Sequence, residues 1–271
     1  MIGGSIARRA RARGDRVVGF DPLQQTIAYA RTHGIVDEAV AQVGELIGRG
    51  ETLAVAAPLE ATLEILERCA SSPPGRTLLV IDVASVKVPL QPFVQRVHGF
   101  VPTHPLAGAE RSGPAASRAD LFDERPWAYV PTGDAQLDAR AVDFIIGMGA
   151  RPVALDAARH DRVVALTSHV PQLLSTVLAA GLAGEDDPLI AQLYGPGLES
   201  MLRLARSAWP MWSSIVAANG PAIAPGLRAL AAAIAAVADR IDAGDMAELE
   251  ALFERANALA ARLDIGERDG S

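Results

Sequence analysis

Strand-like and helix-like segments alternate through the first half of the chain, and this alternation limits the fold more than any other feature. The apolar runs at 52–57 and 77–81 are short and end at a proline or an acid, which predicts buried strands. Residues 60–69, between them, have helical spacing. Because strands that alternate with helices form parallel sheets, the pattern predicts an α/β fold with a doubly wound sheet. Ligands of such sheets bind at the carboxyl ends of the strands.

The second half of the chain has a different pattern, in which helical spacing dominates and no convincing strand follows. Residues 160–182 form one long apolar-rich stretch. The segments 227–241 and 249–263 each carry an apolar stripe at intervals of three and four. Gly244 and Asp245 separate these segments as a helix C-cap and N-cap. The sequence therefore predicts an all-helical second half.

We expect two domains, a Rossmann-like one at residues 1–155 and a helical one at residues 156–271. A helical half this apolar has more nonpolar surface than one subunit needs to bury. It therefore favours a homodimer formed through helices over a self-contained bundle.

The N-terminal segment predicts a helix that ends at Gly14, a short strand at residues 16–20 and then the acid Asp21. Helix, strand and acid in this order form the second half of a dinucleotide-binding βαβ unit, whose carboxylate accepts hydrogen bonds from ribose hydroxyls. Gly3 takes the place of the third glycine of the phosphate-binding fingerprint, the glycine that lets helix and strand pack closely, while the first strand and the first two glycines are missing. The sequence therefore predicts an N-terminally shortened Rossmann-type sheet.

Other interpretations of this segment stay open. The arginines within residues 8–13, with no acid before Asp15, also suit a transit peptide or an ordinary amphipathic helix. A missing phosphate turn and central strand would weaken nucleotide binding. The protein could therefore be a non-catalytic remnant that still forms a dimer. We favour a late start site, with Met1 an internal residue of the natural protein, because the glycine fingerprint resumes in register at Gly3.

Composition narrows the classes of partner. A net charge of −7 and a pI near 5.3 argue against nucleic acid and anionic membranes, and we find no apolar run long enough to span a bilayer. The single cysteine, Cys69, excludes an internal disulfide and a thiolate metal cage, so a cytoplasmic location is the simple default. The five histidines are scattered without the spacing of a metal site.

His104 is the strongest candidate for acid or base chemistry. It follows the apolar run 99–101, lies between Pro102 and Pro105, and precedes a glycine-containing turn. A histidine at a strand end, on backbone restrained by prolines and glycines, is where α/β enzymes place an acid or a base. The alternative is a surface turn whose histidine only caps the backbone. Pro58 also falls at the end of an expected strand, so we expect it to line the same crevice.

Several short motifs occur in the order and spacing of one known family. They are Ile2-Gly3-Gly4-Ser5, Asp82-Val83-Ala84-Ser85-Val86-Lys87, His104-Pro105-Leu106-Ala107-Gly108 with Glu110 and Ser112-Gly113, Asp120-Leu121-Phe122, His160-Asp161-Arg162, Ser168-His169-Val170-Pro171, and Arg203 with Met211-Trp212 and Asn219. Each motif is weak alone, but the ordered series is specific. Nearly end to end, the chain resembles the TyrA family, the prephenate and arogenate dehydrogenases of tyrosine biosynthesis.

The resemblance implies an oxidative decarboxylation in which a hydride passes from the carbon bearing the 4-hydroxyl to NAD and carbon dioxide leaves C1. In the family, the histidine that matches His104 draws off the hydroxyl proton, a task that suits a neutral imidazole with a pKa of about 7. Ser85 matches a serine that supports this histidine and approaches the nicotinamide; the alternative is a turn cap. Arg203 matches the arginine that binds the substrate's side-chain carboxylate, and is otherwise a solvated helix residue.

Two substrate-side positions depart from the family pattern. Gln172 stands where many members carry a second histidine, and Glu199 where some carry a lysine. A carboxylate there favours the ammonium group of arogenate over the keto group of prephenate. We expect prephenate as the substrate because it is the commoner one in such families, with arogenate as the alternative.

The remaining histidines have weaker interpretations. His169 belongs with Gln172 to the expected substrate-binding set, and is alternatively a structural histidine bonded to the backbone. We interpret His160 and Asp161 as an interdomain hinge pair rather than as chemistry. Related β-hydroxyacid dehydrogenases rely on a lysine in the helical half, and Lys87 is the only lysine of this chain, so that family is excluded.

The expected cofactor site comprises Ile2, Gly3, Asp21, Pro58 and Ser85. An acid at the position of Asp21 accepts a hydrogen bond from the 2′-hydroxyl of NAD and repels the 2′-phosphate of NADP. No arginine follows soon after it, so we expect NAD. We expect no metal, because the histidines lack the spacing of a metal site.

Overall fold

The computed structural model describes residues 1–108 and 113–263. It divides into two compact units, Met1–Ile223 and Ala224–Ser271. The strands are β1 (Val18–Gly19), β2 (Glu38–Ala39), β3 (Thr52–Val55), β4 (Leu79–Asp82), β5 (Phe100–Val101), β6 (Thr103–Pro105), β7 (Pro126–Tyr129) and β8 (Arg151–Ala154). The helices are α1 (Ile2–Ala12), α2 (Gln24–Thr32), α3 (Leu59–Ala70), α4 (Ala135–Gly147), α5 (Ala157–Val164), α6 (Val170–Ala183), α7 (Ile190–Leu193), α8 (Pro196–Leu202), α9 (Trp209–Ala243) and α10 (Met246–Arg262), with short 3-10 or π turns at η1 (Val43–Leu46), η2 (Val88–Phe93), η3 (Pro114–Ala116), η4 (Ala165–His169) and η5 (Leu204–Arg206).

Most strands pair in parallel, as the alternating pattern predicts. β3, β4 and β5 form one parallel sheet, and β1 pairs in parallel with β2 in a separate sheet. No strand of the described residues joins β1 to β3, in keeping with the expected shortened Rossmann-type sheet. β6 runs antiparallel to β7, which pairs in parallel with β8. This reversal was not expected, and it arises where Pro102, which has no N–H to donate, separates β5 from β6.

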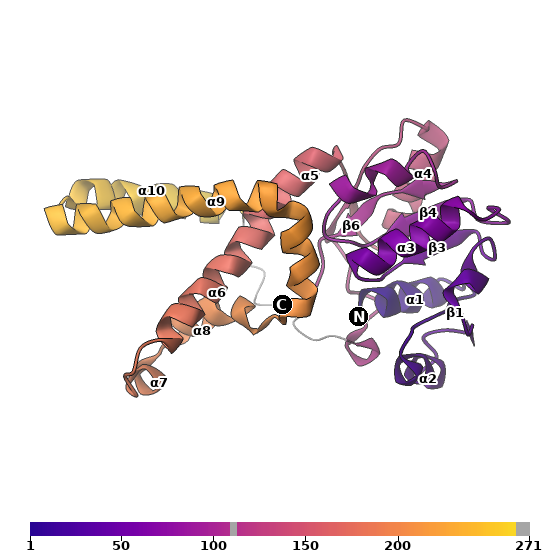
Figure 1. Ribbon diagram of the computed structural model, residues 1–271, viewed down its shortest axis with the longest axis horizontal. Coiled ribbons are helices and arrows are strands. Elements are labelled where there is room, and N and C mark those ends of the chain that lie inside the picture. Colours follow the sequence, from indigo (N-terminus) through magenta and orange to yellow (C-terminus); the bar gives the residue numbers. More distant parts are fainter. Residues whose placement is uncertain (109–112, 264–271) are drawn as a thin grey trace. The chain divides into compact units, whose positions relative to one another are not determined.

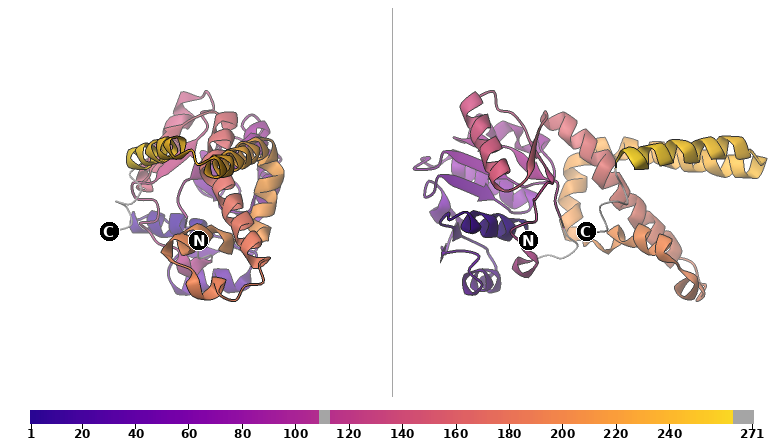
Figure 2. Two further views of the ribbon diagram at one scale, coloured as in Figure 1. Left: turned by 90° about the vertical axis from the view of Figure 1, so that its left-hand side faces the viewer. Right: turned by 180° about the vertical axis from the view of Figure 1, so that it is seen from behind.

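The two faces of β4 bury different helices, which is the arrangement of a doubly wound sheet. Leu79 and Ile81 pack with α1 and α4 residues such as Ile6 and Ile145. Val80, on the opposite face, packs with Leu66 of α3. Figure 1 shows α1, α3 and α4 around strands β3 and β4, and Figure 2 shows the same layers from behind. The predicted α/β fold with parallel strands is confirmed.

The helical part also follows the predicted pattern. The long stretch expected at 160–182 is a continuous helix, Ala157–Ala183, in which the π turn η4 joins α5 to α6 (Figure 2). After α9, Gly244 has a φ of +69° and Asp245 accepts a hydrogen bond from the Glu248 N–H, so both caps are confirmed. The expected domain boundary between residues 155 and 156 stays a prediction.

One expectation from the sequence is wrong. Two helical stretches, Ala157–Ala183 and Trp209–Ala243, are long and apolar enough to cross a membrane by length and composition. Polar side chains interrupt the apolar runs in the sequence, so neither run looked long enough to span a bilayer. The helices continue through these polar residues, and their full length passes the test. Apolar helices of this kind also occur in the cores and subunit interfaces of soluble proteins.

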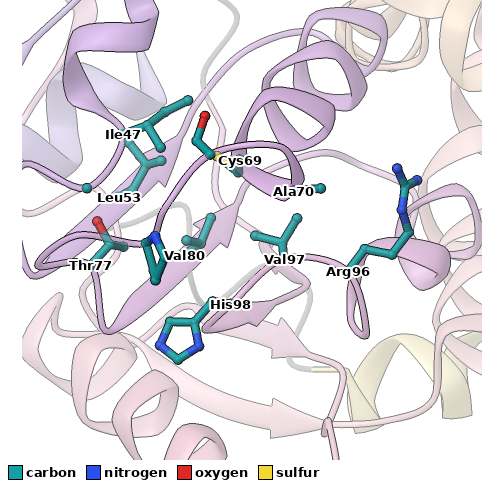
Figure 3. A pocket seen from close by; sticks show the side chains of 12 residues that line it. Ile47, Leu53, Cys69, Ala70, Thr77, Val80, Arg96, Val97 and His98 are labelled. Carbon is teal, nitrogen blue, oxygen red and sulfur yellow. The ribbon is translucent and has the colours of Figure 1, made fainter.

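A small hollow of about 90 Å³ lies beside the amino-terminal ends of the central strands (Figure 3). Its lining includes Leu53, Cys69, Thr77 and Val97. Ligands of parallel sheets bind at the opposite, carboxyl ends of the strands. The functional groups are therefore to be sought at the other edge of the sheet.

Candidate active site

A fully buried ion pair fixes the turn after β4. Asp82 accepts hydrogen bonds from the backbone N–H groups of Ala84 and Thr103, each at 2.9 Å, and from the ammonium of Lys87. Lys87 Nζ also donates to the Thr103 carbonyl at 2.6 Å, and both charged side chains have 0% exposure. Burial raises the pKa of Asp82 and lowers the pKa of Lys87, while their mutual attraction opposes both shifts. This network holds Thr103, and with it His104, against the end of β4.

His104, the middle residue of β6, contacts a histidine on α5. Its Nδ1 lies 3.0 Å from His160 Nε2, and the two rings meet edge to face with their centroids 5.2 Å apart. His160 Nδ1 lies 2.8 Å from Asp161 Oδ1, and the His160 side chain is 1% exposed. The three side chains therefore form a hydrogen-bonded line, and the hinge interpretation of His160 and Asp161 stays a prediction.

The Asp161 carboxylate also anchors the beginning of η2. Its oxygens accept hydrogen bonds from the backbone N–H groups of Lys87 at 2.7 Å and Val88 at 2.9 Å. The Asn219 side chain, on α9, donates to the Asp161 carbonyl at 2.8 Å. Asp161 thus connects the turn after β4 with α5 and α9.

The surroundings of His104 favour its neutral form. Burial is the largest cause that lowers its pKa well below the ordinary value of 6.5, followed by the positive charge of Lys87 and the influence of His160 and His169. The sequence led us to expect a pKa of about 7. The pKa lies lower than that expectation, because neither the burial of His104 nor the ammonium of Lys87 beside it could be read from the sequence.

His169 ends the π turn η4 and is buried, with 1% exposure. Its Nδ1 lies 3.1 Å from Asn219 Nδ2, and its ring meets Trp212 edge to face at 5.7 Å between centroids. Burial lowers its pKa to about 4. Among the residues that the structure describes, the ring bonds the Asn219 side chain and not the expected backbone group. Its role in substrate binding stays a prediction.

Gln172 holds the segment that carries Arg203. Its Nε2 donates to the Leu204 carbonyl at 2.7 Å, and its Oε1 accepts from the Ser207 hydroxyl at 3.3 Å. Arg203 itself is exposed at the C-cap of α8. Glu199 lies four residues earlier on α8 and is also exposed, so the two charged residues share one helix face.

Ser85 lies in the turn between Asp82 and Lys87 and is half-buried. Within the described part of the chain, the contact on His104 Nδ1 belongs to His160, and no hydrogen bond joins Ser85 to His104. The expected support of His104 by Ser85 stays a prediction. Glu110 and Ser112, which belong to the motif after His104, lie outside the described residues.

The expected nucleotide-binding residues also lie at the carboxyl ends of strands. A Cβ on Gly3 would lie 2.9 Å from Ala56 Cβ, so the absence of a side chain lets α1 pack closely on the end of β3. Pro58 is the N-cap of α3. Asp21 follows β1, and its Oδ1 accepts a hydrogen bond from the Leu23 N–H at 2.9 Å. The predicted close packing of Gly3 is confirmed.

Comparison with known proteins identifies the family. Residues 6–154 match the model for the prephenate dehydrogenase nucleotide-binding domain, and residues 156–255 match that for the prephenate dehydrogenase dimerization domain. The chain belongs to the prephenate dehydrogenase family. It is 29% identical over 81% of its length to the prephenate dehydrogenase of Bacillus subtilis, and 31% identical over 89% to the Streptomyces niveus protein named "Probable prephenate dehydrogenase NovF". It spans 62% and 66% of the length of these two relatives.

Solved structures of the prephenate dehydrogenase family share the fold. The arogenate dehydrogenase of Synechocystis superposes with a TM-score of 0.81 at 26% identity, covering 97% of this chain and 96% of that one. The prephenate dehydrogenase of A. aeolicus, in complex with hydroxyphenyl propionate and NAD⁺, superposes with a TM-score of 0.89 at 21% identity, covering 97% and 94%. The doubly wound sheet and the helices after it are therefore those of this family.

Proposed function

We propose that the chain converts prephenate to 4-hydroxyphenylpyruvate with NAD, releasing carbon dioxide. The observation that carries the proposal is His104, a histidine whose surroundings keep it neutral at the carboxyl edge of a family fold. A neutral imidazole accepts a proton and so suits the 4-hydroxyl of the substrate. A structural neighbour with NAD⁺ bound supports the choice of cofactor.

The residues at the amino end of α1 fit NAD. At Gly3 there is no space for a Cβ, which would meet Ala56. The first turn of α1 contains no acid, so no negative charge opposes the positive end of the helix dipole, where a phosphate would bind. Asp21 offers a carboxylate to the ribose, and Pro22, Leu23 and Gln24 after it provide no cation for a 2′-phosphate. Ile2, Gly3, Asp21, Pro58 and Ser85 are the residues that would hold the cofactor.

The reaction divides between the cofactor and the residues of the chain. NAD, when bound, would supply the acceptor for the hydride that leaves C4 of the ring. His104 accepts the proton of the 4-hydroxyl, so that C4 becomes a carbonyl carbon. The bond from C1 to the carboxylate then breaks and carbon dioxide leaves. Its electron pair moves through the ring to the C4 oxygen, which takes the proton back from His104 as the ring becomes aromatic. Arg203 binds the side-chain carboxylate, while Gln172 bonds the Leu204 carbonyl and the Ser207 hydroxyl and so holds the segment just after Arg203 in place.

A homodimer is part of this proposal. The family model over residues 156–255 is that of a dimerization domain. α9 and α10 expose large apolar side chains, among them Ile234, Ile241, Phe253 and Leu259. Pairing with a second copy would cover them. The expected cytoplasmic location and the absence of nucleic-acid and membrane partners stay predictions.

Arogenate is the second candidate substrate. Glu199 shares a helix face with Arg203, so a carboxylate lies near the expected position of the substrate side chain. It would attract the ammonium group of arogenate. The structural neighbour from Synechocystis is an arogenate dehydrogenase.

Steady-state NADH formation with each substrate tests the proposal. We expect turnover with prephenate and 4-hydroxyphenylpyruvate as the product. Turnover with arogenate alone, giving tyrosine, would favour the second candidate, and equal rates would indicate a cyclohexadienyl dehydrogenase. No NADH with either substrate, from a folded dimer that binds NAD, would refute the proposed activity and favour the non-catalytic alternative.

A further inference from the structure

We propose that Asp161 and His160 are positioning residues that fix the tautomer of His104, so that its Nε2 presents a lone pair to the substrate. The proposal deepens the proposed function, because it explains how His104 is kept ready to accept a proton. The hydrogen-bonded line itself does not depend on which substrate binds.

The tautomers follow from the direction of each hydrogen bond. Both oxygens of Asp161 accept hydrogen bonds from backbone N–H groups, and a carboxylate can only accept. His160 must therefore carry its proton on Nδ1, 2.8 Å from Asp161 Oδ1. A neutral His160 then has a lone pair on Nε2, and His104 must donate to it from Nδ1 at 3.0 Å. The remaining nitrogen of His104, Nε2, is left with the lone pair.

The same line balances charge when His104 becomes a cation. The groups that act on the His104 ring are the Lys87 ammonium, which opposes its protonation, and the rings of His160 and His169. A carboxylate lies beyond His160, on Asp161. As His104 takes up a proton, its Nδ1–H becomes a stronger donor to His160. The negative charge of Asp161 then stabilises the positive charge on His104 through the hydrogen-bonded line.

The contacts of His160 separate a positioning role from general packing. Asp161 also stabilises the local structure, because its carboxylate accepts hydrogen bonds from the backbone at the start of η2 and its carbonyl accepts one from the Asn219 side chain. In the described residues, the hydrogen bonds of the His160 ring go to His104 and Asp161. Substitutions at His160 therefore interrupt the line and leave the hydrogen bonds of Asp161 to the η2 backbone in place.

Nitrogen-15 NMR of histidine-labelled protein tests the tautomers directly, since the chain has five histidines. We expect His104 and His160 to be protonated on Nδ1 near neutral pH. His169 should be the opposite tautomer, with its proton on Nε2, because its Nδ1 accepts from Asn219. A proton on His104 Nε2 in the free enzyme would overturn the proposal even if the chain turns over prephenate.

Kinetics of three His160 variants test the consequence. The amide of His160→Gln reaches the place of Nε2 and keeps an acceptor for His104, whereas that of His160→Asn reaches only the place of Nδ1. We expect His160→Leu to lower kcat by about 100-fold, with KM for prephenate changed by less than about threefold. His160→Gln should retain about tenfold more activity than His160→Asn. His33→Gln, at an exposed histidine stacked on Tyr29, is the matched control.

The outcomes separate this proposal from the proposed function. Equal kcat values for the Gln and Asn variants, or a loss carried by KM alone, would overturn the positioning role while the wild-type enzyme remains a prephenate dehydrogenase. If His160→Leu fails to fold, the comparison of the Gln and Asn variants and the wild-type NMR measurement still decide the question. Wild-type protein without turnover, but with His104 protonated on Nδ1, would refute the function and leave the hydrogen-bonded line standing.

Discussion

Lys87→Met removes the cation from the buried pair at the end of β4. Methionine fills a similar volume but cannot donate to Asp82 or to the Thr103 carbonyl, which receives its hydrogen bond from Lys87 Nζ at 2.6 Å. Both charged side chains have 0% exposure, so water cannot replace the lost partner. Asp82 keeps the backbone donors of Ala84 and Thr103.

Removing one partner of a buried ion pair destabilises a protein by about 3–5 kcal/mol. A typical domain has about 5–15 kcal/mol of unfolding free energy, so the variant loses a large part of its stability. With a urea m-value of about 3 kcal/mol per M, the midpoint of unfolding falls by about 1–1.7 M. Adding Asp82→Asn removes the uncompensated charge as well, so we expect the double variant to recover part of the loss.

The pH dependence gives the sign of the effect. In Lys87→Met, burial without a cation holds the pKa of Asp82 above its ordinary 3.8. A raised folded-state pKa gives stability that is present below the unfolded pKa and is lost as pH rises through the folded-state pKa. Urea unfolding followed by circular dichroism should therefore show the smallest deficit near pH 4 and the largest at neutral pH. A deficit below about 1 kcal/mol, or one equal at both pH values, would refute the reasoning.

Three further predictions concern the ligand sites. Gly3→Ala places a Cβ 2.9 Å from Ala56 Cβ. We expect it to destabilise the protein by about 1–3 kcal/mol and to weaken NAD binding measured by calorimetry. The control Gly44→Ala adds its Cβ in open space and should have neither effect. Arg203→Gln should raise KM for prephenate by about 10- to 100-fold with little change in kcat, and Arg206→Gln should not. Asp21→Ser should raise the ratio of NADP to NAD use by about tenfold in kcat/KM.

The sequence predicts the layers of the fold because their signals are local. Apolar runs of strand length, helical stripes and the caps at Gly14, Gly244 and Asp245 each depend on residues close together in the chain. The close approach at Gly3 was predictable for the same reason. Pro102 is a local signal too, yet the sequence shows only that pairing is interrupted there and not that β6 runs antiparallel to β7.

The hydrogen-bond network of the candidate site was not predictable, because it joins residues that are far apart in the sequence. His104 and His160 are 56 positions apart, and Lys87 meets Thr103 16 positions on. No spacing rule connects such pairs. The adjacent His160 and Asp161 at the beginning of a helix were the available signal, and the ordered motifs included them, but the hinge interpretation set them aside.

The measurement that tests the central claim most directly is the simultaneous release of NADH and carbon dioxide from prephenate. We expect equal amounts of the two products from the wild-type chain, a loss of about 100-fold or more in kcat for His104→Asn, and wild-type activity for His33→Asn. Wild-type rates from a folded His104→Asn variant, or NADH without carbon dioxide, would contradict the account.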